Sequence, residues 1–413
     1  MTLADSEGST PLHFAVERLG VNSEGYDPIV TVLLKHEAPV NVMSNRGETP
    51  LYVACRKGLT GVVKQLLDCK ADVGLTTGDS KKYPLMTACE GKYRDVAMML
   101  LDRGADSNVI NEKQTPLILA SANGDDVLVE QLLACGANVN EMQGIGDTAL
   151  HVAVVPRRDS HNEAFVSIVQ RLLKSGAEPN AHNDEGKTPL YLACNPTLAE
   201  VNVGIVHILL ENGANPNIHA CCSPWLGDSP LSLAAIRGNS ELAMLLIKFG
   251  ARVNHSDGDG RTALHFAVGR GSVYYVRRME SVKSEVSIIA EKLLSAGADV
   301  NTIERNGSSP LYLACEAGKA DFVKLLLSHG ANPNISLDTT DKYPLHAACK
   351  GQHYDAVKLL LEYNADVNVR DRNDKTALHY ALESRPKSRY STDSSKTTVL
   401  AQLLLDGGAE CRR

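Results

Sequence analysis

The sequence predicts an all-α fold in which short helices stack in pairs. Three observations support this prediction. One short phrase, TPLHFAV in its first copy, recurs eleven times along the 413 residues. Successive copies begin 32 to 47 residues apart, and half of these spacings are 33 or 34 residues. A second apolar stretch follows each copy and is followed by glycine in eight of them. A fixed period of this length is typical of a repeat architecture.

The phrase predicts the first helix of each repeat. Thr or Ser begins nine copies, and its hydroxyl can accept a hydrogen bond from the first helical turn. Pro follows in eight copies, where its missing N–H costs nothing. The Leu and Ala after it form an apolar face. Tyr83 and Tyr343 replace the capping residue in the other two copies, without a local explanation. The copies begin near residues 10, 49, 83, 115, 148, 188, 229, 262, 309, 343 and 376.

The residue after the second apolar stretch predicts where the second helix ends. Glycine adopts the left-handed conformation that terminates a helix, and Asn364 is the next best choice. Glu37 and Lys70 occupy this place in the first two repeats, which we therefore expect to be less stable. The eight glycines are Gly104, Gly136, Gly176, Gly213, Gly250, Gly297, Gly330 and Gly408.

A short segment links each second helix to the next first helix; we call it a finger. It has the pattern Ala-(Asp/Asn)-(Val/Pro)-Asn, followed by a polar turn. Together with the period and the Thr-Pro-Leu-His phrase, it resembles the ankyrin repeat over nearly the whole chain. The resemblance implies that the fingers are β-hairpins. It also implies a structural role for the fourth residue of the phrase, whose side chain would bond to loop backbone and tie neighbouring repeats together: His13, His151, His265, His346 and His379.

One helix pair cannot bury its apolar face alone, whereas stacked neighbours share a continuous core. We therefore expect residues 1–413 to form one array, a solenoid with the shape of an elongated curved domain. Neither the opening segment, which matches a finger, nor the closing helix carries the polar cap that solubility requires. This favours the interpretation that the sequence belongs to a longer protein.

Insertions between the two helices distinguish repeats 1, 5, 6, 8 and 11, and they predict long loops on one rim. The three TALH copies begin at residues 148, 262 and 376, at equal spacings of 114 residues, which indicates duplication of a three-repeat block. The insertion in repeat 8 contains Tyr274, Tyr275, Arg277 and Arg278. We consider two interpretations, a basic edge for an acidic or phosphorylated partner and an ordinary solvated loop.

Two further positions are candidates for partner binding. Trp225 and Leu226 lie in an unusually long finger before repeat 7. Trp is enriched at interface hot spots, although this one could also fold back as local core. Arg305 and Arg372 lie in later fingers, which in ankyrin repeats contribute to the concave face that usually binds the partner.

Composition excludes several classes of protein. The net charge of −7 argues against a nucleic-acid partner. No apolar run approaches the ~20 residues of a membrane helix, and no secretory signal begins the chain. These features predict a cytoplasmic location, with the nucleus as the alternative. Five of the ten cysteines follow Ala at one place in the phrase, which indicates buried, reduced thiols rather than a metal site.

We found no catalytic motif, so we expect no enzyme activity, cofactor or metal. The sequence predicts a protein–protein interaction scaffold or adaptor that binds its partner on the concave face. One alternative is the targeting or regulatory region of a larger enzyme or channel. Another is a small ligand or nucleic acid bound on the concave face.

Overall fold

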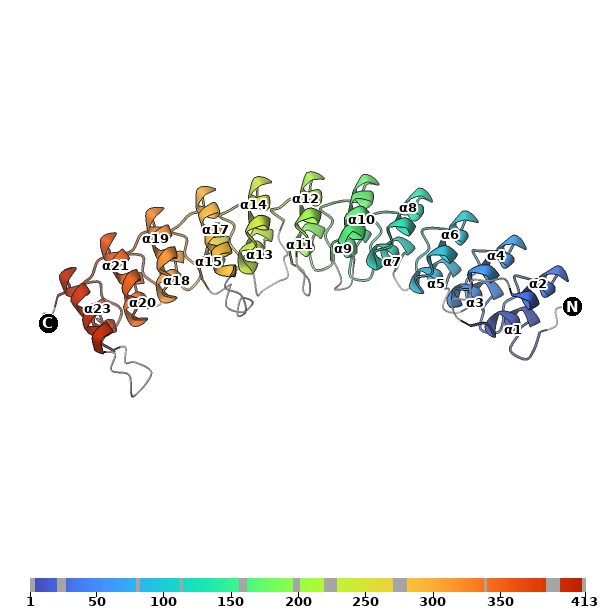
Figure 1. The fold of residues 1–413 in the computed structure, drawn as a ribbon, viewed down its shortest axis with the longest axis horizontal. Coiled ribbons are helices and arrows are strands. Elements are labelled where there is room, and N and C mark those ends of the chain that lie inside the picture. Colours follow the sequence, from blue (N-terminus) through green and yellow to red (C-terminus); the bar gives the residue numbers. More distant parts are fainter. Residues whose placement is uncertain are drawn as a thin grey trace. The chain divides into compact units, whose positions relative to one another are not determined.

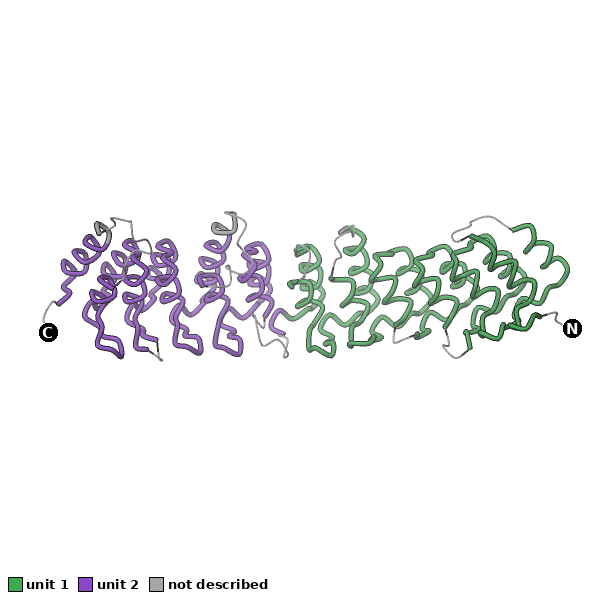
Figure 2. Tube along the Cα trace, turned by 90° about the horizontal axis from the view of Figure 1, so that it is seen from below, with its two compact units in different colours: residues 1–215 green, residues 216–413 purple. Residues whose placement is uncertain are grey.

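The computed structural model describes residues 4–20, 27–78, 82–111, 114–155, 162–195, 201–218, 229–269, 281–337, 340–383 and 394–410. Within these ranges the chain forms 22 helices and isolated β-bridges, which confirms the predicted all-α class. The residues divide into two compact units, 1–215 and 216–413 (Figure 2). No helix in the described ranges is long and apolar enough to cross a membrane.

The first unit contains six consecutive helix pairs among its described residues, and each pair joins a first helix to an adjacent second helix (Figure 1). Their bounds are α1 (Pro11–Glu17), α2 (Pro28–Lys35), α3 (Pro50–Lys57), α4 (Thr60–Asp68), α5 (Pro84–Glu90), α6 (Arg94–Asp102), α7 (Pro116–Asn123), α8 (Asp126–Ala134), α9 (Ala149–Ala153), α10 (Asn162–Lys174), α11 (Pro189–Cys194) and α12 (Val203–Glu211).

The second unit contains five such pairs among its described residues. Their bounds are α13 (Pro230–Arg237), α14 (Ser240–Lys248), α15 (Ala263–Val268), α17 (Ser281–Ser295), α18 (Pro310–Glu316), α19 (Ala320–Ser328), α20 (Pro344–Lys350), α21 (Tyr354–Glu362), α22 (Ala377–Glu383) and α23 (Ser394–Asp406).

First helices begin where the phrase predicts. The hydroxyl of Thr49, for example, accepts a hydrogen bond of 3.1 Å from the backbone N–H of Tyr52. Pro50 follows at the first helical position. Tyr83 makes no side-chain capping bond at the start of α5, so that helix begins without one.

Small buried residues let successive first helices approach closely. The helix α3 packs against α5, and α18 packs against α20. Cys55 and Cys315 are fully buried in α3 and α18, and burial raises the pKa of both thiols. The same place in the phrase holds buried Cys89, Cys194 and Cys349, and all five are free thiols, as the sequence predicts for small core residues.

Left-handed residues follow the second helices of both units. The eight glycines predicted to end these helices have φ between +80° and +94°. Asn364, Lys70 and Glu37 adopt the same conformation, with φ of +63°, +62° and +57°. The helix end is therefore built in the same way with or without glycine. The first two repeats, like the tenth with Asn364, differ from the eight glycine repeats by a side chain at a strained position, which costs about 1–2 kcal/mol for most L-residues.

An exchange of these residues should change stability in opposite directions. Lys70→Gly should raise the free energy of unfolding by about 1 kcal/mol, because it removes the strain at the end of α4. Gly330→Lys should lower it by a similar amount, since a Cβ at Gly330 would meet no atom within 4 Å and adds strain alone. Urea denaturation followed by circular dichroism measures both effects. A destabilised Lys70→Gly variant would contradict this explanation.

The inserted residues lie mostly in ranges outside the described structure: 21–26, 156–161, 196–200, 270–280 and 384–393. Each of these ranges falls between the first and second helix of a pair. Part of the extra sequence is helical in three pairs, because α10, α17 and α23 have 13, 15 and 13 residues, whereas α4 has nine. In these pairs the insertion extends the second helix as well as the connection.

Candidate partner-binding surface

The fingers are tight turns held by their own backbone. In the finger at 41–48, Ser44 N–H donates to Glu48 O at 2.9 Å and Gly47 N–H donates to Ser44 O at 2.8 Å. Gly47 has φ of +71°, and a Cβ at this position would overlap the backbone nitrogen of Gly78 in the next finger. Neighbouring fingers therefore approach so closely that only glycine fits here.

Backbone hydrogen bonds also join the tips of successive fingers. Asn45 N–H donates to Glu7 O at 2.8 Å, and Asp184 N–H donates to Ile145 O at 2.9 Å. In the second unit, Arg305 N–H donates to Asp259 O at 2.6 Å. These bonds fix each tip against its neighbour, so side chains at the tips project from a preorganised surface.

In most fingers an asparagine side chain forms two hydrogen bonds with the backbone at the end of the next second helix. Asn140 Nδ2 donates to Gly176 O at 3.0 Å, while its Oδ1 accepts from Glu178 N–H at 2.8 Å. Gly74 occupies the corresponding place in the finger between α4 and α5 and has no side chain to make these bonds. The same pair of bonds is made by Asn108, Asn180, Asn217, Asn254, Asn301, Asn334 and Asn368.

Histidines in the fourth place of the phrase connect first helices to the following finger. His13 Nδ1 accepts from the backbone N–H of Thr10 at 3.1 Å. Its Nε2 must then carry the proton, which it donates to Glu48 O at 2.9 Å in the next finger. The equivalent bonds from Nε2 run from His151 to Lys187 O, from His265 to Ser308 O and from His346 to Val369 O, at 3.1 to 3.2 Å.

Comparison with known families agrees with this geometry. A family model described as "Ankyrin repeats (3 copies)" matches residues 1–77, 19–111, 60–143, 85–164, 198–279, 278–371 and 330–411. A second model, "Ankyrin repeat", matches residues 145–184. Together these matches cover more than half of the sequence. The chain belongs to the ankyrin repeat family.

Relatives share ankyrin repeats within proteins of different kinds. The chain is 30% identical over 331 residues to "Ankyrin repeat and KH domain-containing protein mask-1" of Caenorhabditis elegans, which covers 72% of this chain and 12% of that protein. It is 34% identical over 183 residues to human "Ankyrin repeat and SOCS box protein 16", covering 42% of this chain and 39% of that protein. In both comparisons the match spans less than half of the relative's length.

Burial keeps three of the ankyrin histidines neutral. Desolvation lowers the pKa of His265 to about 4, although its bond to Ser308 O acts in the opposite direction. Desolvation also lowers the pKa of His151 and of His346. A second proton on His265 Nδ1 would face the backbone N–H of Thr262, which is 3.2 Å away. His379 has the same contact with Thr376 but is exposed.

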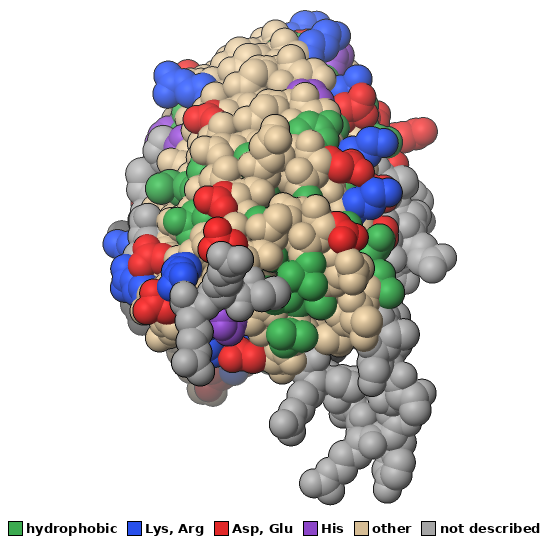
Figure 3. All heavy atoms as spheres, turned by 90° about the vertical axis from the view of Figure 1, so that its left-hand side faces the viewer, with side chains coloured by type: hydrophobic (Ala, Val, Ile, Leu, Met, Phe, Trp, Pro, Cys, Tyr) green, Lys and Arg blue, Asp and Glu red, His purple; other side chains and the backbone are tan. Residues whose placement is uncertain are grey.

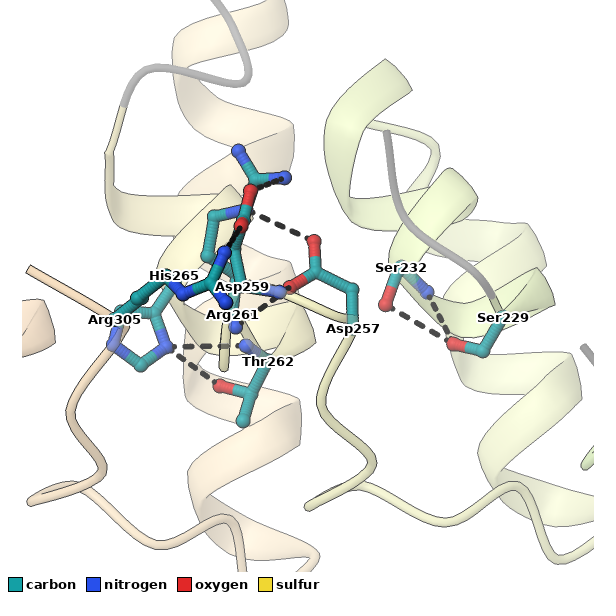
Figure 4. A network of polar contacts seen from close by, with 8 residues as sticks. All are labelled: Ser229, Ser232, Asp257, Asp259, Arg261, Thr262, His265 and Arg305. Carbon is teal, nitrogen blue, oxygen red and sulfur yellow. Dashed lines mark hydrogen bonds and ion pairs between the residues drawn. The ribbon is translucent and has the colours of Figure 1, made fainter. Parts of the chain in front are cut away.

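The predicted candidates Arg305 and Arg372 lie at finger tips, where each faces a carboxylate of the preceding finger. Arg305 Nη1 is 3.7 Å from an oxygen of Asp259, which also binds Arg261 at 3.0 Å (Figure 4). Arg372 Nε is 2.8 Å from an oxygen of Asp341. The side chain of Arg305 is 81% exposed, so this ion pair stabilises the finger little and leaves the guanidinium accessible.

The other six predicted candidates lie outside the described residues: Trp225, Leu226, Tyr274, Tyr275, Arg277 and Arg278. Their assignment to partner binding stays a prediction from the sequence. In the ranges that the structure does describe, no group of His, Cys, Asp and Glu side chains could hold a metal ion.

Exposed apolar residues on the fingers of the first unit were missed by the sequence interpretation. Met43, Ile110 and Met142 each lie two residues after a finger asparagine, and Ile145 is at the tip of the finger between α8 and α9. We call these four residues the finger row; their side chains are 42% to 53% exposed. The sequence signal that could have identified Met43, Ile110 and Met142 is their shared position two residues after the asparagine, where a polar turn residue would be expected.

Proposed function

We propose that this chain is a protein-interaction scaffold that binds its partner through the fingers and the adjoining first helices. The finger row supports this proposal most directly. Hydrogen bonds already hold the backbone of the fingers, so little backbone entropy is lost when a partner covers these large apolar side chains. Arg305 and Arg372 would add charged contacts from the fingers of the second unit.

Two relatives favour the alternative in which the ankyrin repeats serve a larger protein. The chain is 30% identical over 195 residues to a "Transient receptor potential cation channel subfamily A member 1 homolog" of Caenorhabditis elegans. It is 25% identical over 336 residues to "E3 ubiquitin-protein ligase KEG" of Arabidopsis thaliana. The matches span 15% and 17% of those proteins, so a targeting or regulatory role is proposed here for the repeats alone.

The finger row can be tested by replacing two of its members. Met142→Glu with Ile145→Glu should weaken capture of the partner at least about tenfold, because each change places a charge in an apolar contact. The measurement is affinity capture from the source cell, followed by titration of the identified partner with purified wild type and variant.

Val127→Glu is the matched control, since Val127 is 43% exposed on the second helix α8 and not on a finger. It should bind the partner as the wild type does. Equal affinity of the finger variant and the wild type would rule out the finger row as the binding surface.

A further inference from the structure

The tips of two neighbouring fingers in the first unit place an apolar side chain beside an acidic one. Ile145 is at the tip of the finger between α8 and α9, and Asp184 N–H, at the tip of the next finger, donates to Ile145 O at 2.9 Å. A Cβ added at Gly146 would lie 2.8 Å from a carboxylate oxygen of Asp184. The carboxylate is therefore held against the tip that carries Ile145, and both side chains are exposed.

The same two tip positions hold an ion pair in the second unit. Asp259 takes the place of Ile145, three residues before the phrase, and Arg305 takes the place of Asp184, four residues before it. Arg305 Nη1 is 3.7 Å from an oxygen of Asp259. Figure 3, drawn from the side of α23, shows other Lys and Arg side chains beside those of Asp and Glu. In the first unit, no Lys or Arg among the described residues forms an ion pair with Asp184.

Further carboxylates surround this pair of tips. The fingers at 140–147 and 180–187 contain one basic residue, Lys187, which pairs with Glu185. The helices α9 and α11 that follow these fingers contain no Lys or Arg. Met142 and Ile145 are therefore exposed apolar residues in acidic surroundings, and electrostatic complementarity favours a partner that brings positive charge. The four carboxylates of the two fingers belong to Glu141, Asp147, Asp184 and Glu185.

The spacing of successive fingers selects the conformation of the partner. The first helices α7 and α9 pack against each other, and helices in contact lie about 8–10 Å apart. We therefore expect Ile110 and Met142, on the fingers that lead into α7 and α9, to follow one another at about this distance. An α-helix rises about 1.5 Å per residue, so its side chains return to one face after about seven residues and 10 Å. An extended strand covers this distance in about three residues, which turns the side chain to the opposite face.

Two other modes of peptide recognition fit this surface less well. Addition of a strand needs free backbone groups, whereas the tips of these fingers already bond to one another through Asp184 N–H and Ile145 O. A polyproline segment also returns to one face, after about 9 Å, but its binding sites are lined by aromatic rings. The finger row consists of Met and Ile only. Apolar side chains of this kind, with flexible Met among them, suit the apolar face of a helix.

We propose that the part of the finger row formed by Ile110, Met142 and Ile145 binds a basic amphipathic α-helix of a partner protein. Apolar side chains seven residues apart on that helix would cover the row, and a neighbouring Lys or Arg would pair with Asp184. This inference rests on the proposed function, because it names the kind of partner that the fingers bind.

Selection of binding peptides from a random display library on the immobilised full chain tests the proposal. Peptides of about 20 residues are long enough for about 30 Å of helix. The selected peptides should carry a net positive charge and apolar residues seven positions apart, and they should gain helical circular dichroism on binding. Met142→Ser with Ile145→Ser should weaken their binding at least about tenfold, because it removes the apolar contact without adding charge.

Asp184→Asn tests the charged contact separately. It should weaken binding of the selected peptides about two- to fivefold at low salt, the effect of one exposed ion pair, and make the affinity less sensitive to NaCl. Asp321→Asn is the matched control, since Asp321 is exposed in the first turn of the second helix α19 and not on a finger. Equal affinity and equal salt dependence of Asp184→Asn and the wild type would overturn the pairing with Asp184.

The remaining outcomes distinguish this inference from the proposed function. Peptides that require Met142 and Ile145 but are acidic, or that bind without gaining helix, overturn the inference and leave the finger row as the binding surface. Peptides that bind the double serine variant as tightly as the wild type count against the finger row itself, and the inference fails with it. Circular dichroism of each protein variant alone verifies that it is folded.

Discussion

Gly47→Ala should lower the free energy of unfolding by about 3 kcal/mol. Two costs add at this position. An L-residue at φ of +71° is strained by about 1–2 kcal/mol. The new Cβ would also overlap the backbone of Gly78, so two fingers must separate, which costs about 1–3 kcal/mol as other overpacking does. Urea denaturation followed by circular dichroism measures the sum.

Gly104→Ala separates the two costs. Gly104 has φ of +80°, but a Cβ there would meet no atom within 4 Å. In this control variant the free energy of unfolding should fall only by the cost of the strained backbone conformation, about 1 kcal/mol. If both variants lost the same free energy, close approach of the fingers would make no contribution to stability.

These two glycines show what the sequence could predict and what it could not. Gly104 follows a second helix in a repeated position, so its left-handed conformation followed from the pattern. The finger glycine Gly47 is equally visible in the sequence, but its contact with Gly78 depends on how closely neighbouring fingers stack. Local rules describe a single residue, whereas this constraint arises between two repeats.

The candidate binding surface also combines features that the sequence predicts with features that only the structure shows. The sequence placed Arg305 and Arg372 on fingers, but the carboxylates that pair with them come from other repeats. Met142 and Ile145 were not singled out in the sequence, and the structure shows that their side chains are exposed.

Acid should destabilise this protein through its buried histidines. An unfolded histidine has a pKa near 6.5, whereas burial lowers the pKa of His265 to about 4. Below pH 6.5 the unfolded chain therefore binds the proton more tightly than the folded chain. The contribution of neutral His265 is complete above pH 6.5 and is lost as the pH falls toward 4, by about 3 kcal/mol in total. His151 and His346 act in the same direction.

Asp371 should not interfere in this pH range. Burial would raise the pKa of its carboxyl, but hydrogen bonds from the Tyr380 hydroxyl and from the backbone N–H groups of Lys375 and Asn373 outweigh burial and lower the pKa to about 2. The stability that these bonds confer is present above the ordinary pKa of 3.8 and is lost only as the pH falls toward 2. Asp371 therefore contributes little to a loss of stability between pH 6.5 and 4.

His265→Tyr tests the assignment with a replacement that the protein already uses. Tyr52, Tyr191 and Tyr312 fill the same place in other repeats and are 2% to 7% exposed, so the fold accommodates this side chain. The variant should remain folded at pH 7, and its loss of stability between pH 6.5 and 4 should be smaller by about 3 kcal/mol, measured by urea denaturation at each pH. His379→Tyr makes the same substitution at an exposed position and is the matched control. An unaltered slope in the His265 variant would mean that burial of this imidazole does not control the response to acid.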